Sequence, residues 1–227
     1  MAISPSRLEP MLVRSTARPP FGKADWLFEV KQDGIRLMAY LDGEHVRLLT
    51  RRGRNVTSQL PELGALRQEL GGPSSAILDG ELVAYNEHGI PDFGLVLQRI
   101  RTESWRRVDA LRREIPVAYV AFDLLELGGH DLRAFPLSER KARLRTLIGD
   151  DARHVAFSDH WQASDGEALF RAIYQRQLEG VVAKRATSPY VSGRRSWHWV
   201  KLKTPYARDV RAHQARGAAP DASSVPT

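Results

Sequence analysis

The stretch Trp26-Leu27-Phe28-Glu29-Val30-Lys31-Gln32-Asp33-Gly34-Ile35-Arg36 decides the fold of this chain. Residues 26–30 and 35–40 are both rich in strand-forming side chains. Asp33-Gly34 between them is a turn signal, because Gly takes a positive φ without steric conflict and Asp tolerates one. The pattern predicts a rigid hairpin that carries Lys31 at its turn, where an amine can be held against a ligand.

Working outward, the hydrophobic pattern predicts a mixed α+β fold, mostly antiparallel, with flanking helices. Residues 76–85 read as a strand pair or a bulged strand, and residues 1–25 read as irregular. Ser138 is a favourable residue to cap a helix that begins there. The other expected strands are 26–31, 35–41, 45–50, 116–125, 180–185 and 197–202, and the other expected helices are 61–70, 93–113 in one or two pieces, and 165–177.

Composition restricts the classes of protein that the chain can form. The 227 residues are 42% hydrophobic, which is enough for a packed core, and the formal net charge of +7 favours a polyanionic partner. An arginine-rich protein without such a partner is the alternative. The absence of cysteine excludes disulfides and thiolate zinc sites. No membrane span and no signal peptide are recognisable, so we expect a cytoplasmic protein, and a nucleoid-associated one if it is bacterial.

The chain has neither of the two commonest glycine-rich phosphate loops. A nucleotide would therefore have to be bound by charged side chains on strands. In Trp199-Val200-Lys201-Leu202-Lys203, strand alternation places Lys201 and Lys203 on the same face. Two ammonium groups side by side are unfavourable unless an anion or a carboxylate lies between them. The pattern therefore predicts an anion site, or a solvated face as the alternative.

Five short motifs in order give a specific resemblance. They are Lys31-x-Asp-Gly-x-Arg36, Asp79-Gly80-Glu81, Phe122-Asp123, Glu179-Gly180 through Lys184, and Lys201-x-Lys203. This series resembles the adenylation domain of ATP-dependent DNA ligases, especially the bacterial ligase D type. The resemblance implies an ATP-grasp-like nucleotidyltransferase fold over residues 1–206, and we expect residues 207–227 to form a disordered tail.

The resemblance also implies a role for each matching residue around the nucleoside. Lys31 resembles the amine that attacks the α-phosphate of ATP to form lysyl-AMP. Glu29 matches the residue that recognises the adenine amino group, and Phe122 matches the aromatic side chain that stacks on the base. Arg36 and Glu81 match residues around the ribose and the phosphate.

Further matches concern phosphates and the metal. Arg51 looks like the arginine that meets the 5′-phosphate of nicked DNA or the nucleotide. Glu179 resembles the acid close to the metal, Mg²⁺ with Mn²⁺ as an alternative, and Glu81 is its expected partner. Lys184, Lys201 and Lys203 resemble phosphate ligands. Asp33 is expected either to hold Lys31 or simply to make the turn.

One departure from the family pattern concerns the OB-fold domain that normally follows. Only residues 204–227 follow Lys203, which puts complete nick sealing by this chain in question. Three explanations are open: a partner protein that supplies an OB fold or an end-joining function, a minimal ligase, or a non-sealing protein that keeps the nucleotide pocket. The expected substrate is nicked or broken double-stranded DNA. The alternatives are an RNA ligase or capping-type nucleotidyltransferase, and a non-catalytic module that binds nucleotide or nucleic acid.

Overall fold

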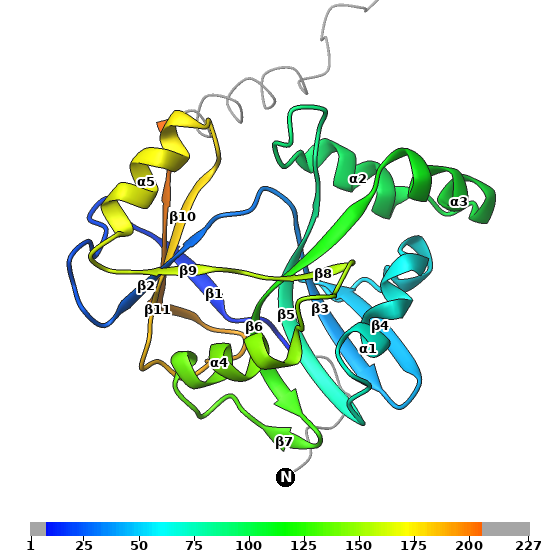
Figure 1. The fold of residues 1–227 in the computed structure, drawn as a ribbon, viewed down its shortest axis with the longest axis horizontal. Helices are drawn as coiled ribbons and strands as arrows, with labels where there is room; N and C mark the ends of the chain where they lie inside the picture. The colour runs from blue at the N-terminus through cyan, green and yellow to red at the C-terminus, as the bar shows by residue number, and fades with distance from the viewer. Residues whose placement is uncertain (1–7, 206–227) are drawn as a thin grey trace, which may run out of the picture.

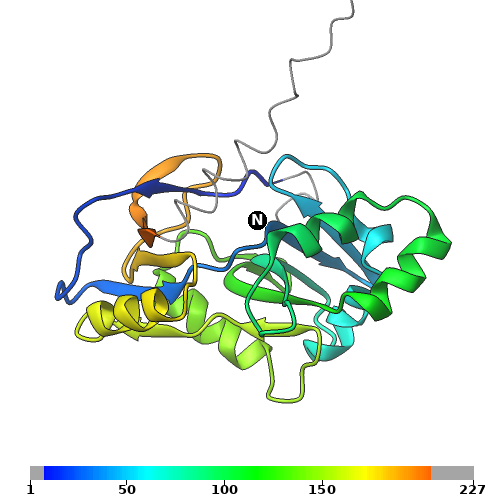
Figure 2. The same ribbon diagram turned by 90° about the horizontal axis from the view of Figure 1, so that it is seen from above.

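A computed structural model describes residues 8–205 as two β-sheets that stand side by side, with helices on their outer faces (Figures 1 and 2). The first sheet has the order β1-β11-β10-β2-β9, and the second has the order β4-β3-β5-β6-β7, with β8 paired to β6. All but two of the pairings are antiparallel, the exceptions being β1 with β11 and β6 with β8. The mixed, mostly antiparallel α+β class expected from the sequence is confirmed.

The first sheet is built from the two ends of the described chain. Its strands are β1 (Leu12–Ser15), β2 (Trp26–Val30), β9 (His160–Gln162), β10 (Gly180–Arg185) and β11 (Arg195–Lys203). Helix α5 (Gly166–Gln175) covers its outer face, where Phe28, Val181 and Ala183 pack against Ile173. The opposite face of β10 and β11 is thereby left to carry polar side chains.

The second sheet is formed by the middle of the chain. Its strands are β3 (Ile35–Asp42), β4 (His45–Thr50), β5 (Ser75–Ala84), β6 (Val117–Leu127), β7 (His130–Asp131) and β8 (Val155–Phe157). The helices are α1 (Leu66–Glu69), α2 (Phe93–Arg101), α3 (Trp105–Glu114) and α4 (Leu137–Leu147), with 3₁₀ turns at Thr57–Gln59 and Pro61–Ala65. The segment 93–113 thus forms two helices. Of the segment 76–85, all residues but Tyr85 lie in one strand, β5, which has two register irregularities against β6.

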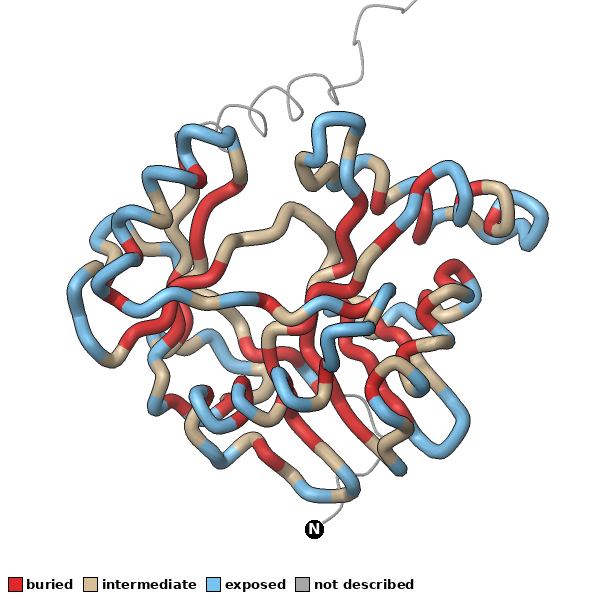
Figure 3. The backbone as a smooth tube through the Cα atoms, viewed as in Figure 1, coloured by how far each residue is buried: buried red, intermediate tan, exposed pale blue. Residues whose placement is uncertain are grey.

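Both faces of the second sheet are buried, as Figure 3 shows by the red along its strands. Leu37, Ala39 and Leu41 of β3 pack into the core beneath helices α1–α4, whereas Met38 and Tyr40 point the other way. That second side meets Met11 and Trp199 from the first sheet's side of the molecule. Strand alternation therefore gives β3 a role in both cores, and the smaller core joins the two sheets.

The predicted hairpin at Lys31 is wrong. Strand β2 pairs with β9 and β10 in the first sheet, whereas β3 pairs with β4 and β5 in the second. Residues 31–34 are the passage from one sheet to the other. Gly34 does not have a positive φ, and the physical reason for glycine is closeness, because a Cβ atom there would lie 2.1 Å from the Leu82 carbonyl oxygen.

Two smaller expectations also fail. The segment expected to be irregular contains β1, which pairs in parallel with β11. Ser138 lies inside α4, which begins at Leu137 after Pro136, and no side chain caps it. Instead the amides of Leu137 and Ser138 donate to the carbonyls of Ser188 and Ala186. The predicted tail 207–227 lies outside the described residues, and within 8–205 no helix is long and apolar enough to cross a membrane.

Candidate active site

A cleft of about 1050 Å³ lies between the two sheets. All ten side chains that the sequence singled out for the site line it, from β2, β10 and β11 on one wall and β3, β5, β6 and the end of β4 on the other: Glu29, Lys31, Arg36, Arg51, Glu81, Phe122, Glu179, Lys184, Lys201 and Lys203. A second cavity of about 940 Å³, beside α1 and α4, is lined by none of them.

Lys31 is held by a carboxylate that it shares with a second lysine. Its Nζ donates to Glu179 Oε2 at 2.6 Å, and Lys203 Nζ contacts Glu179 Oε1 at 2.6 Å. The two ammonium groups hold the pKa of Glu179 below its ordinary value although burial alone would raise it. The alternation of β11 does direct Lys201 and Lys203 into the cleft. The carboxylate seen there, Glu179, lies between Lys203 and Lys31, whereas the expectation concerned Lys201 and Lys203.

The carboxylate of Glu81 lines the cleft and makes no hydrogen bond or ion pair with another residue of the range 8–205. The cations nearest to it are engaged elsewhere, since Lys31 pairs with Glu179 and Arg36 pairs with Asp79. Burial raises the pKa of Glu81 to about 7, against the attraction of Lys31 and Arg36. Its oxygens are therefore available to a ligand's donor or to a cation.

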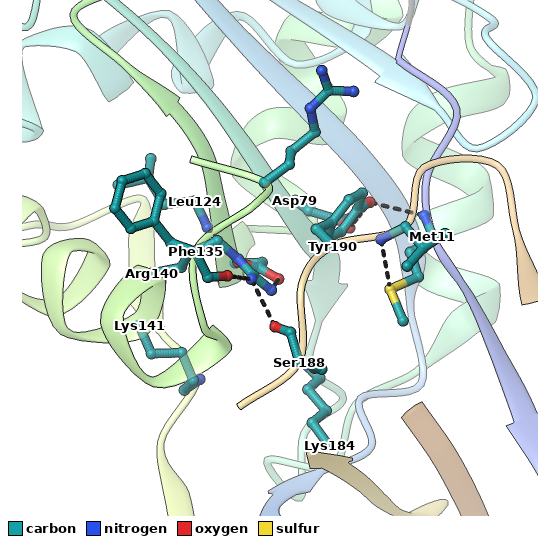
Figure 4. Close-up of polar contacts among 12 residues, drawn as sticks. Met11, Asp79, Leu124, Phe135, Arg140, Lys141, Lys184, Ser188 and Tyr190 are labelled. Atoms are coloured by element: carbon teal, nitrogen blue, oxygen red, sulfur yellow. Dashed lines mark hydrogen bonds and ion pairs between the residues drawn. The ribbon is translucent and has the colours of Figure 1, made fainter. Parts of the chain in front are cut away.

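Arg36 is fixed by a network behind the cleft. Its Nε and Nη2 donate to Asp79 Oδ1 and Oδ2 at 2.8 and 2.6 Å, and the Tyr190 hydroxyl donates to Oδ2 at 2.6 Å. Tyr190 in turn accepts from the amide of Met11 at 2.9 Å, a bond drawn in Figure 4. Burial alone would lower the pKa of Arg36, but the Asp79 carboxylate raises it above the ordinary value. Arg36 thus stays charged and immobile.

At the base of the cleft, Glu29 lies between two lysines. Its Oε1 accepts from Lys141 Nζ at 2.9 Å, and its Oε2 accepts from Lys184 Nζ at 2.8 Å and from the Ser158 hydroxyl at 3.0 Å. Lys184 Nζ also lies 4.1 Å from the ring centroid of Phe122 and 4.5 Å from that of Trp199. Burial lowers the pKa of Lys184 to about 8. A hydrogen-bond acceptor (Glu29), a donor (Lys184) and the aromatic rings thus lie close together at the base of the cleft.

The mouth of the cleft is basic and partly apolar. Arg51, Arg52 and Arg54 follow β4 and are exposed, and Phe93 and Leu97 of α2 line the cleft opposite the first sheet. Phe93 is 38% exposed. These exposed arginines are therefore placed to bind, at the rim, the part of an anion that is too large to enter the cleft.

The cleft's oxygen ligands fit a magnesium ion that is bound largely through phosphates. Mg²⁺ prefers hard oxygen ligands and often takes one or two carboxylates together with substrate phosphates. Glu81 offers free oxygens, whereas both oxygens of Glu179 contact lysines. Among residues 8–205, no group of three or more His, Cys, Asp and Glu side chains is placed to hold a metal. The cleft therefore fits a cation that arrives with its phosphates.

Sequence reasoning missed the partners that hold the site residues from behind. Lys141 belongs to a helix whose pattern of Arg, Lys and Glu reads as a solvated face, yet it is 1% exposed. Asp79 was visible only as a neighbour of Glu81, and Tyr190 was not among the expected site residues. The signal for Asp79 was a carboxylate within a hydrophobic strand, which is rarely found without a partner.

Comparisons with known proteins agree with this geometry. Residues 10–203 match a family model described as "ATP dependent DNA ligase domain". The chain is 42% identical over 200 residues to the multifunctional non-homologous end joining protein LigD of Pseudomonas aeruginosa, covering 88% of this chain and 22% of that protein. It is 33% identical over 195 residues to the SPbeta prophage-derived DNA ligase-like protein LigB of Bacillus subtilis, covering 86% of this chain and 67% of the relative.

A solved structure described as mycobacterial DNA ligase D complexed with ATP and MES has the same fold. Its TM-score is 0.72 at 34% identity, and the match covers 86% of this chain and 60% of that one. This chain therefore spans about a fifth of the Pseudomonas aeruginosa relative and 60% of the solved chain.

Proposed function

The chain belongs to the family of ATP-dependent DNA ligase domains, and from that premise we propose that Lys31 is the nucleophile of its adenylation reaction. The chain is an adenylation domain, homologous to ligase D and other DNA ligases, and we assign residues 1–206 to it. The observation that carries the proposal is the position of Lys31, in a cleft with the nine other expected residues and in contact with Glu179.

In the proposed reaction Lys31 Nζ attacks the α-phosphorus of ATP. The Lys31 ammonium first loses a proton to water to become a neutral amine. A P–N bond then forms while the P–O bond to pyrophosphate breaks, and the attacking nitrogen releases a second proton to water. Lys203 and Lys201 lie along the same face of β11 and stabilise the negative charge that develops on the phosphate oxygens. A bound Mg²⁺ would further neutralise that charge, with Glu81 as its uncommitted carboxylate and Glu179 beside it.

The base of the cleft suits the adenine ring. Glu29 accepts from the amino group and Phe122 offers an aromatic face. We assign Lys184, which the family resemblance gave to the phosphates, instead to the base as a donor beside Glu29, because its Nζ contacts Glu29 and lies over Phe122. Arg36, held by Asp79, lies toward the sugar and phosphates together with Glu81. These assignments rest on the donors and acceptors present in the cleft and on the matching motifs of the family.

Sealing of DNA is the second part of the proposal. The adenylate would pass from Lys31 to the 5′-phosphate of nicked or broken double-stranded DNA, which the exposed Arg51 meets at the rim. The relatives include an end-joining protein, so we place the activity in DNA repair in the cytoplasm, close to the nucleoid. An OB-fold domain or an end-joining factor from another protein is the expected partner.

The deciding experiment is incubation with α-labelled ATP and Mg²⁺, followed by a denaturing gel. Wild-type protein should retain label, and Lys31→Ala should lose it. Lys23→Ala removes an exposed lysine shortly before β2 and is the matched control, which should label like the wild type. The intact mass is measured first, because protein that already carries AMP cannot be labelled again. Retained label in Lys31→Ala would refute the assignment.

The nucleic-acid specificity is tested separately. Purified lysyl-AMP protein, free of ATP, is mixed with a nicked DNA duplex or with the same nick in RNA, with and without an added OB-fold domain. The proposal expects loss of protein-bound AMP and sealing of the DNA. Labelling by GTP in preference to ATP, or sealing of RNA alone, would favour the RNA ligase or capping alternatives instead.

A further inference from the structure

Lys141 lies behind the cleft and not in its lining. It extends from α4, as Figure 4 shows, and its side chain is 1% exposed. Its Nζ donates to Glu29 Oε1 at 2.9 Å and to the carbonyl oxygen of Ser158 at 2.9 Å. The ammonium also lies 4.5 Å from the ring centroid of Phe157. A buried lysine with two acceptors this close is a built contact and not a solvated side chain.

These two acceptors belong to the two passages between the sheets. The chain described by the structure leaves the first sheet at residues 31–34, directly after β2, and returns to it at residues 158–159, between β8 and β9. Glu29 is next to the first passage and Ser158 is in the second. Lys141 therefore joins the two passages through one ammonium group, and the Ser158 hydroxyl adds a direct bond to Glu29 at 3.0 Å.

Lys141 also sets the charge state of Glu29. Burial of this carboxyl would raise its pKa, but Lys141 and then Lys184 outweigh the burial, and the net pKa of Glu29 is below the ordinary value. Without Lys141, Oε1 would lose its partner in a site where Glu29 is 2% exposed. The carboxylate could then rotate or take a proton, and either change alters what it presents to the cleft.

Toward the cleft, Glu29 and Lys184 form an acceptor beside a donor. An adenine edge offers the complement, an amino donor beside a ring-nitrogen acceptor. Guanine presents the reverse, an oxygen acceptor beside an N–H donor. Its oxygen would face the Glu29 carboxylate, acceptor against acceptor, and its N–H would face the Lys184 ammonium, donor against donor. A buried polar pair of this kind discriminates strongly between bases only while its orientation and protonation are fixed.

We propose that Lys141 is a positioning residue that holds Glu29 ionised and correctly oriented, so that the cleft accepts adenine and rejects guanine nucleotides. The inference rests on the proposed function, because it takes the cleft as the nucleotide site. Lys141 touches no substrate itself. Its effect is on selectivity, through Glu29 and Ser158.

The test compares ATP and GTP on the same preparation of full-length protein. Rates of covalent labelling by each nucleotide are measured for wild type, Lys141→Met and Lys141→Arg, and their ratio cancels any difference in the folded fraction. Lys141→Met should lower the ratio of ATP to GTP by at least about tenfold, the effect of one charge-assisted hydrogen bond. Lys141→Arg keeps the charge and should recover most of it. If Lys141→Met does not fold, Lys141→Gln is measured with the same expectation.

A matched control separates selectivity from stability. Arg99→Met also removes a buried cation, one that binds Glu62 and the Ile115 carbonyl, and none of these three residues lines the cleft. It should lower the melting temperature and leave the nucleotide ratio unchanged. An unchanged ratio in Lys141→Met, with only the melting temperature lowered, would overturn the proposal.

Failure of the proposed function would be recognised separately. If wild-type protein forms no covalent adduct, equilibrium binding of ATP and GTP is measured by calorimetry on the same variants. The expected loss of ATP preference in Lys141→Met applies to binding as well. Equal affinities of wild type and Lys141→Met for both nucleotides would refute the role of Lys141 whatever the fate of the nucleophile.

Discussion

Replacing Glu81 by glutamine should stabilise the protein above pH 7 and have little effect near pH 4.5. Burial raises the pKa of Glu81 to about 7 in the folded protein, from an ordinary value of 4.5. The folded state therefore binds this proton more tightly than the unfolded chain does. The stability that the proton contributes is complete below pH 4.5 and is lost as the pH rises through 7.

The magnitude follows from these two values. Between pH 4.5 and 7 the free energy of unfolding should fall by about 1.4 kcal/mol per pH unit through this one group, or about 3 kcal/mol in all. Glutamine resembles the protonated carboxyl and does not titrate. The free energy of unfolding of Glu81→Gln minus that of wild type should thus grow from near zero at pH 4.5 to about 3 kcal/mol at pH 8.

Urea denaturation of the two proteins at pH 4.5, 6, 7 and 8 measures this difference. Glu29 and Glu179 have the opposite dependence, because their lowered pKa values make stability fall at acid pH. Taking the difference cancels the contribution of Glu29, and that of Glu179 in part, since Glu179 repels Glu81. Glu87→Gln makes the same change of net charge on a side chain that is 86% exposed and controls for it. Parallel curves for wild type and Glu81→Gln across this range would refute the burial argument.

Three further substitutions test the framework of the site. Gly180→Ala places a Cβ 2.1 Å from the Leu202 carbonyl oxygen at a φ of +149°, so its melting temperature should fall steeply or the protein should not fold, and wild-type thermal stability would contradict the geometry. Asp79→Asn leaves Arg36 buried without its carboxylate and should lower the free energy of unfolding by about 3–5 kcal/mol in urea. Trp197→Ala removes a side chain that is 62% exposed and should change stability by less than about 0.5 kcal/mol, so a larger loss would reveal a contact beyond the cation–π pair with Arg14.

Which residues line the cleft could be predicted from the sequence, because the alternation of side chains along a strand is a local property. Lys201 and Lys203 had to share a face of one strand, and the two lysines do enter the cleft. The hairpin at Asp33-Gly34 failed for the opposite reason. Strand pairing is non-local, and β2 finds better partners in β9 and β10, more than 120 residues away along the chain. A turn signal states that the chain bends, not which strands pair.

The supporting residues were beyond the same reasoning. Lys141 and Ser138 lie in one helix. Ser138 was judged by residue type alone, and Lys141 was not among the expected site residues. The burial of Lys141 depends on Glu29, 112 residues earlier, and the beginning of α4 depends on carbonyls of the 186–188 loop. Such choices are made by tertiary contacts that override local preference. In a single sequence these contacts are visible only as an unusual charged residue in an otherwise ordinary pattern.

The two passages are the only places where the described chain crosses between the sheets, so they are where a hinge between the sheets would lie, with Lys31 at that hinge. When two sheets rotate about a hinge, each atom moves in proportion to its distance from the hinge axis. Rim residues such as Arg51 would travel furthest if the sheets shifted to admit a large ligand. Lys31 is tied to Glu179 and is the first residue of the passage 31–34, beside the Glu29–Lys141 ion pair, so it would move least. The proposed nucleophile would thus keep its place while the rim of the cleft adjusted.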